Sequence, residues 1–122
     1  MSGQVCTVAW ADGVTLECTW RHSRWLPMLC RADGVTLGPT TAVHPRIAVP
    51  ELQFLRHEFT HARQQAEAKK AGMGLVRWVL RYLIHPSVRR AAELEADLAR
   101  LGWYENGVKV GNPTITVLKE IA

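Results

Sequence analysis

The sequence predicts an α+β fold in which a small antiparallel sheet is followed by three helices. Two observations predict this. Residues 4–10 and 14–20 alternate and are rich in side chains that favour strands, whereas residues 51–71 and 87–101 repeat apolar side chains at helical spacing. A chain of 122 residues is large enough for one modest core, so we expect a single domain over residues 1–122.

The first fifty residues are expected to be mainly strands and loops. Asp12-Gly13 lies between the first two strands and is a turn signal that predicts a hairpin. Residues 20–30 are ambiguous, and we interpret them as a loop that packs Trp25 and Leu26 on the sheet. Further strands are expected at residues 35–37 and 41–49.

Residues 51–102 are expected to be the helical part of the domain. Pro50, with an acidic residue beside it, is a start signal for a helix that Gly72 ends. Ser87 is expected to cap the beginning of a later helix, which ends at Gly102.

Two further segments complete the chain. Residues 75–84 are strongly apolar, carry Arg77 and Arg81 one helical turn apart, and are too short to span a bilayer. They are expected to form a third helix over the core or, alternatively, a hydrophobic surface that contacts a membrane or a partner protein. Residues 103–122 are expected to be a C-terminal tail, in which residues 106–107 form a turn.

The composition excludes several classes of protein. An apolar share of 48% and a charged share of 21% are those of an ordinary globular protein. The net charge is +4, but the basic residues are spread from Arg21 to Lys119 without a dense run or an aromatic-interleaved patch. We therefore expect no nucleic-acid partner.

The cysteines and the N-terminal residues predict a compartment. Cys6, Cys18 and Cys30 are too widely spaced for a zinc knuckle, and we expect reduced thiols in or near the core. The first residues lack the basic-then-apolar layout of a signal peptide. Together these features predict a cytoplasmic location.

The most informative motif is HExxH at residues 57–61, inside the first predicted helix. His57 and His61 are one turn apart and project from the same face. Two imidazoles at this spacing can share one zinc ion at about 2.0–2.1 Å each. Glu58 is placed to take a proton from a zinc-bound water.

The two sides of this helix differ in composition. One stripe is apolar and is expected to face the core; it consists of Leu52, Leu55, Phe59, Ala62 and Ala66. The roughly opposite face carries His57, His61, Gln64 and Ala68 and is short of charge. This pattern predicts a helix with a core on one side and a lined cleft on the other.

A catalytic zinc site needs a third protein ligand and keeps its fourth position for water. Glu93 and Glu95, on the later helix, are both candidates. Glu95 falls within an apolar arc of that helix, where an unpaired carboxylate is costly. It therefore stays an alternative to Glu93, and both can instead form salt bridges with nearby arginines. The remaining histidines are predicted not to be ligands: His22, His44 and His85.

These motifs resemble a known family. HExxH followed by a Glu on a later helix, in the form ExxxD, resembles the gluzincin branch of the zincin metallopeptidases. Residues 93–97 (ELEAD) are similar to a stretch of membrane-associated gluzincins that cleave prenylated or misfolded proteins. The wider pattern looks like small single-domain zincins of bacterial and phage genomes, with TLG at 36–38, LRHEFTHARQ at 55–64 and ELEA at 93–96.

The resemblance implies a zincin-like fold and a zinc-dependent peptidase acting on a peptide or protein substrate. It implies that His57, His61 and Glu93 bind Zn²⁺ and that Glu58 is the general base. It also implies that Asp97 hydrogen-bonds a ligand histidine. An edge strand within residues 36–49 is implied to pair with extended substrate.

Two other interpretations stay open at this point. The chain can be a zinc-bearing interaction module, such as a phage or regulatory accessory protein, that binds peptides without turnover. Such a module keeps its ligands but tolerates loss of Glu58. Alternatively, the motif is accidental and the site holds no metal.

Overall fold

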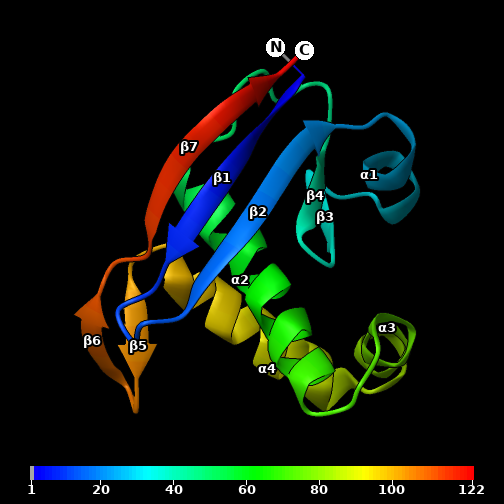
Figure 1. The fold of residues 1–122 in the computed structure, drawn as a ribbon. Helices are drawn as coiled ribbons and strands as arrows, with labels where there is room; N and C mark the ends of the chain where they lie inside the picture. The colour runs from blue at the N-terminus through cyan, green and yellow to red at the C-terminus, as the bar shows by residue number, and fades with distance from the viewer. Residues whose placement is uncertain (1) are drawn as a thin grey trace.

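The structure is a computed structural model that describes residues 2–122. The predicted α+β class is confirmed: a five-stranded sheet and a two-stranded sheet combine with four helices. Figure 1 shows α2 against one face of the larger sheet and α4 packed on α2, with α1 and α3 at one side. In chain order the elements are β1 (Gly3–Ala9), β2 (Thr15–His22), α1 (Trp25–Cys30), β3 (Gly34–Leu37), β4 (Thr40–Val43), α2 (Leu52–Lys70), α3 (Leu75–Ile84), α4 (Pro86–Ala99), β5 (Trp103–Glu105), β6 (Val108–Gly111) and β7 (Thr114–Ile121).

The larger sheet has the strand order β3-β4-β2-β1-β7. The predicted hairpin forms, because β1 and β2 pair antiparallel on either side of the turn at Asp12-Gly13. The sheet is mixed, however, and not antiparallel throughout as predicted, since β2 and β4 run parallel. The reason is the route of the chain, which leaves β2, passes through α1 and reaches β4 by way of the antiparallel strand β3.

Residues 103–122, which were predicted to be a C-terminal tail, form strands of both sheets. The turn at Asn106-Gly107 is confirmed and joins β5 to β6. The strand β7 then pairs antiparallel with β1 along its length, with Val8 opposite Ile115. The larger sheet is therefore not built from the first fifty residues alone. This pairing joins segments about as far apart as the chain allows, so local periodicity does not reveal it.

Several element boundaries differ from the predictions. Residues 25–30 are the short helix α1 and not a loop, and Trp25 is 73% exposed rather than packed on the sheet. The helix α4 begins with Pro86 at its first position and has His85, not Ser87, as its N-cap. The strand expected at 41–49 ends at Val43. Within residues 2–122, no helix has the length and apolar character needed to cross a bilayer.

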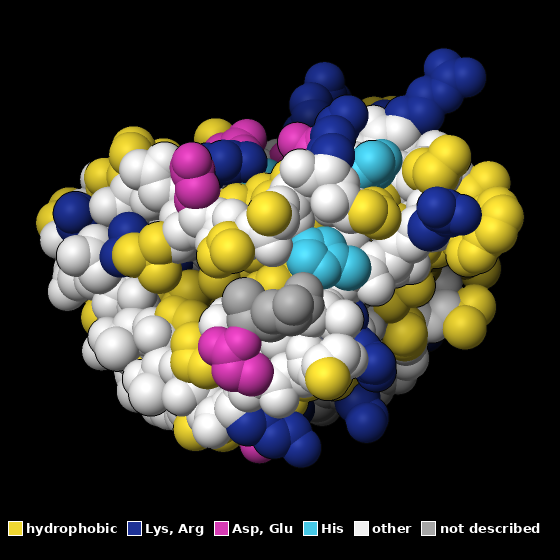
Figure 2. Space-filling view, turned by 90° about the horizontal axis from the view of Figure 1, so that it is seen from above, with side chains coloured by type: hydrophobic (Ala, Val, Ile, Leu, Met, Phe, Trp, Pro, Cys, Tyr) yellow, Lys and Arg dark blue, Asp and Glu magenta, His cyan; other side chains and the backbone are white. Residues whose placement is uncertain are grey.

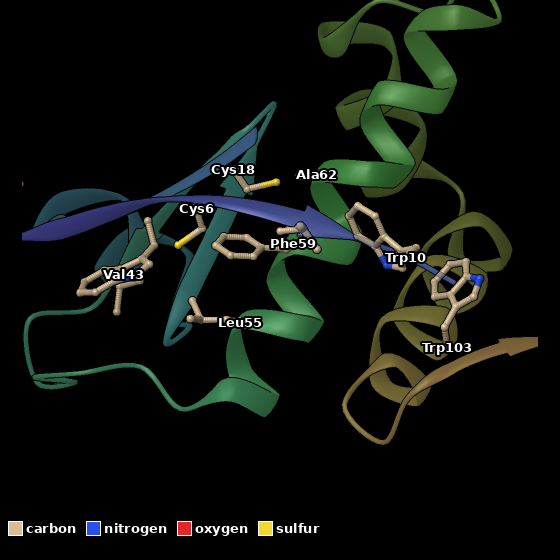
Figure 3. Packing of buried hydrophobic residues seen from close by; sticks show 10 residues of the cluster. Cys6, Trp10, Cys18, Val43, Leu55, Phe59, Ala62 and Trp103 are labelled. Carbon is tan, nitrogen blue, oxygen red and sulfur yellow. The ribbon is translucent and has the colours of Figure 1, made fainter. Parts of the chain in front are cut away.

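The core lies between the larger sheet and α2, as Figure 3 shows. Phe59 of α2 is fully buried and points toward the two core thiols, Cys6 and Cys18, on neighbouring strands. Burial raises the pKa of Cys18 to about 12, so this thiol stays protonated at neutral pH. Cys30 is exposed, whereas the other two free cysteines lie in the core as expected.

Arg63 of α2 contacts both the first hairpin and β5. Its guanidinium lies 5.1 Å from the ring centroid of Trp10 and 4.3 Å from that of Trp103, which is cation–π distance. It also forms ion pairs with Asp12, in the β1–β2 turn, and with Glu67, one turn along α2. Arg63 thus joins α2 to the first hairpin and to β5, and it is itself buried.

Candidate metal centre

The helix α2 carries three of the predicted site residues on the side that lines a cleft. His57, Glu58 and His61 are 8%, 7% and 7% exposed. They line a cleft of about 720 Å³ whose other walls come from α1, β3, α3 and α4. The prediction of a helix between a core and a lined cleft is therefore confirmed, although Leu52, at the end of the apolar stripe, is exposed.

The helix α4 brings Glu93 to the two histidines. One carboxylate oxygen, Oε2, lies 3.3 Å from Nε2 of His57, and the other, Oε1, lies 3.2 Å from Nε2 of His61. Hydrogen bonds from His57 and His61 hold the pKa of Glu93 well below its usual range, against the opposing effect of burial. The carboxylate is therefore ionised at neutral pH.

These three side chains fit a divalent metal ion. One donor atom from each lies within 4.8 Å of the others. A tetrahedral ion with bonds of about 2.0–2.1 Å separates neighbouring donors by about 3.3 Å. The Glu93 oxygens lie 3.3 Å and 3.2 Å from Nε2 of His57 and His61. Two imidazoles and one carboxylate are also a donor set typical of catalytic zinc, which leaves one position open. Within residues 2–122, no second group of three His, Cys, Asp or Glu side chains meets these criteria.

Glu95, the alternative ligand, makes a different contact. Its Oε1 accepts a hydrogen bond of 3.0 Å from Nε2 of Gln64 and is not part of the three-residue group. The apolar arc predicted for this helix is also displaced in the structure. The buried residues of α4 are Ala96 and Ala99, and this turns Glu93 rather than Glu95 toward the histidines.

Asp97 lies where the resemblance implies, one turn after Glu93. Its Oδ1 is 3.0 Å from Nδ1 of His57 and 3.6 Å from Nε of Arg100. The angles at Nδ1 are not those of a hydrogen bond, and this buried nitrogen has no hydrogen-bond partner within residues 2–122. The contact between Asp97 and His57 is therefore close but not aligned.

Gln64 orients His61. The amide nitrogen of Gln64 donates to the carbonyl oxygen of Ala92 at 2.9 Å and to Glu95, which leaves its Oε1 to face Nδ1 of His61 at 2.8 Å. Since this oxygen can only accept, Nδ1 of His61 must carry the proton. With Nδ1 held by Gln64, Nε2, which contacts Glu93, is the nitrogen that would bind a metal ion.

The strand β3 positions Glu58. Thr36 donates a hydrogen bond of 2.8 Å to Oε2 of Glu58, and its hydroxyl also lies 2.8 Å from that of Thr41. The backbone of β3 passes close to the carboxylate: a Cβ added at Gly34 would lie 3.3 Å from the carboxyl carbon of Glu58 and 2.6 Å from the ring of Phe54. A glycine is therefore needed where the strand crosses this helix.

Tyr82 of α3 reaches the same site. Its hydroxyl donates a hydrogen bond to Oε1 of Glu93, and its ring stacks on Trp78 with centroids 5.4 Å apart. Burial raises the pKa of Tyr82, and the hydrogen bond to Glu93 adds to the rise, so the phenol is protonated at neutral pH. The sequence holds no signal that Tyr82 faces the site.

The other predicted non-ligands lie outside the centre. Nε2 of His22 is 2.6 Å from the carbonyl oxygen of Ile47, and Nδ1 of His44 accepts a hydrogen bond from the backbone N–H of Arg46. His85 occupies the N-cap position of α4 without a side-chain hydrogen bond to the helix. His22 and His44 therefore have roles in the local structure.

Comparison with known proteins finds no relative of this chain. The chain matches no family model, no curated protein and no solved structure. The function has to be inferred from the geometry of the site and from the motifs that build it.

Proposed function

We propose that this protein is a zinc-dependent metallopeptidase that hydrolyses peptide bonds. The observation that carries the proposal is the position of Glu93, whose carboxylate lies 3.2–3.3 Å from Nε2 of both His57 and His61. Two helices far apart in the sequence thus supply a compact set of three donors. His57, His61 and Glu93 would hold Zn²⁺, which would polarise a scissile carbonyl and lower the pKa of a bound water toward 7.

Glu58 is assigned the role of general base. It accepts a proton from the attacking water and passes it to the leaving amine. Its Oε2 is held by Thr36, so the carboxylate has a fixed orientation in the cleft. A base that is already oriented avoids reorganisation during the reaction.

Two neighbours of the donors support this chemistry. Gln64 keeps Nδ1 of His61 protonated, so that Nε2 stays free to act as a donor. Tyr82 is protonated and its hydroxyl donates to Glu93, so we assign it the role of holding the third donor in position.

The substrate is proposed to be an extended peptide segment. The strand β3 is an edge of the larger sheet and lines the cleft. Gln65 binds the carbonyl oxygen of Thr36 and the N–H of Gly38, so we propose that the substrate pairs with the remaining backbone groups of this edge. Pairing of this kind reads the backbone and tolerates many sequences. We also propose a cytoplasmic location, which the three free cysteines support.

The first test is metal content. Chelator-free protein should contain about one zinc per chain, and His57→Ala should lose it. The matched control is His44→Ala, which changes a histidine outside the site and should keep the zinc. Absence of zinc from wild-type protein purified in its presence would rule out the proposed centre.

The second test separates hydrolysis from binding alone. Wild-type protein should cleave members of a peptide library, and a chelator should stop cleavage. Glu58→Gln should keep zinc but lose activity by roughly 100-fold or more, since a general base contributes on that scale. If wild-type protein with one bound zinc captures peptides and cleaves none, it is an interaction module.

A further inference from the structure

The mouth of the cleft is framed by two helices, α1 and α3. Leu26 and Cys30 of α1 line it on one side, and Val79 and Leu83 of α3 line it on the other. Figure 1 shows both helices at the same side of the molecule, away from β7. We call the outward surface of α1 and α3 the rim.

The rim is strongly apolar. On α1, Trp25 is 73% exposed and Leu29 is 78% exposed. On α3 no residue is buried, and Val76 and Leu80 are 74% and 51% exposed. Hydrophobic side chains gather around a basic one at the right of Figure 2, on the side where α1 lies in Figure 1. A surface of this kind marks an interaction site rather than ordinary solvent-facing helices.

The rim is also cationic. The helix α3 carries Arg77 and Arg81, and Arg24 and Arg31 flank α1. Neither helix contains an Asp or Glu residue.

On α3 the apolar and the basic side chains lie on separate, neighbouring stripes. At 100° per residue, Val76, Leu80 and Leu83 form one outward stripe, and Arg77 and Arg81 lie beside it. An apolar stripe flanked by arginines is the pattern of a helix that lies in a bilayer interface, where long basic side chains reach the headgroups. Trp25 on α1 adds a residue type that favours this interface.

We propose that the rim docks on the surface of an anionic phospholipid bilayer, with the mouth of the cleft facing the membrane. The unbalanced positive charge favours this occupant over a second copy of the chain. In a two-fold dimer through the rim, arginines would face arginines, since both subunits use the same patch. Peptide segments close to the membrane would then be the ones that reach the site.

The test is sedimentation with vesicles made of phosphatidylcholine alone or of phosphatidylcholine and phosphatidylglycerol. The full chain carrying Glu58→Gln is used, so that binding is measured without proteolysis. It should sediment with the anionic vesicles and not with the neutral ones, and added salt should weaken the binding. Failure to bind anionic vesicles would overturn the proposal.

Two double variants locate the contact. Arg77→Gln with Arg81→Gln should lower the partition coefficient about 30-fold, since each charge near an anionic surface is worth about fivefold. Leu29→Ser with Leu80→Ser should lower it roughly 10-fold or more through lost apolar contact. All four side chains are exposed, so the fold should persist, which circular dichroism checks.

The matched controls lie elsewhere on the surface. Val108→Ser and Leu118→Ser remove apolar side chains that are 63% and 54% exposed on β6 and β7, and Lys109→Gln with Lys119→Gln removes two charges. These variants should bind vesicles like the parent chain. Rim variants that bind as well as the controls would contradict the proposal. So would a wild-type dimer that rim variants dissociate and that does not bind vesicles.

Discussion

Gln64 and Gln65 are neighbours on α2, and their side chains bind the helix to two different walls of the cleft. Gln64 contacts α4 through the carbonyl oxygen of Ala92, next to Glu93. Gln65 contacts β3: it accepts a hydrogen bond from the backbone N–H of Gly38 and donates one of 2.9 Å to the carbonyl oxygen of Thr36. The element that holds the third donor and the element that orients Glu58 are therefore both anchored next to the HExxH motif.

Replacing Gln64 with Leu should weaken zinc binding roughly 10- to 100-fold, as is typical when a partner of a metal ligand is lost. The variant leaves Nδ1 of His61 without its acceptor and releases α4 beside Glu93. Competition with a chromophoric chelator measures the change. Gln53→Leu is the matched control, since Gln53 is exposed on the same helix, and its zinc affinity should equal that of the wild type.

Glu93→Gln and Glu95→Gln distinguish the two candidate ligands. We expect Glu93→Gln to lose zinc affinity by more than roughly 100-fold, because a donor is removed rather than the partner of a donor. Glu95→Gln should change it much less, since Glu95 only accepts a hydrogen bond from Gln64. Calorimetric zinc titration measures both, and the opposite order would assign the third position to Glu95.

Gly34→Ala should lower kcat/KM roughly 10-fold while zinc stays bound. The added methyl group would lie 2.6 Å from the ring of Phe54 and 3.3 Å from the carboxyl carbon of Glu58, so Phe54, β3 or the base has to move, and we expect the shift to disturb Glu58. Gly74→Ala is the control, because a methyl group there meets no atom within 4 Å. Unchanged kinetics in Gly34→Ala would show that the position of β3 does not constrain Glu58.

Arg63→Met should destabilise the fold by about 2–3 kcal/mol through loss of two cation–π contacts and two ion pairs. Its partners Asp12 and Glu67 stay partly exposed, so their charges are not left buried. Urea unfolding measures the change in the free energy of unfolding. Arg90→Met, at an exposed position of α4, should stay within about 0.5 kcal/mol of the wild type.

The pairing of Asp12 with Arg63 should also appear in the pH dependence of stability. The hydrogen bond from Arg63 lowers the pKa of Asp12 below its ordinary value of 3.8. The pair therefore stabilises the fold above that value, and this contribution is lost as the pH falls through the lowered pKa. The free-energy difference between wild type and Asp12→Asn should shrink on acidification, and a difference independent of pH would contradict the assignment.

The sequence predicted the parts of the site that lie within one helix and left open the parts that depend on packing. His57, Glu58 and His61 follow from spacing alone. Glu93 could not be separated from Glu95, because the apolar arc predicted for α4, which includes Leu98, contains Glu95. The structure packs α4 through Ala96 and Ala99 instead and leaves Leu98 exposed.

Local sequence patterns did not predict contacts between segments that are distant in the sequence. The strand β7 was predicted to be part of a tail, because its partner is β1, at the other end of the chain. The role of Thr36 depends in the same way on β3 crossing α2, a contact between residues 22 positions apart. The hairpins at residues 12–13 and 106–107 were predictable, since the turn residues themselves carry the signal.

The absence of buried residues in α3 has a consequence for how the cleft can open. Detaching this helix exposes little additional apolar surface, so the free energy of its local opening is a small part of the global stability. The contact from Tyr82 to Glu93 and those from Arg89 to the end of α3 are the main bonds that have to break. Amide protons of α3 should consequently exchange with solvent well before those of α2, and a bulky chain can enter by displacing one helix while the donors on α2 stay in place.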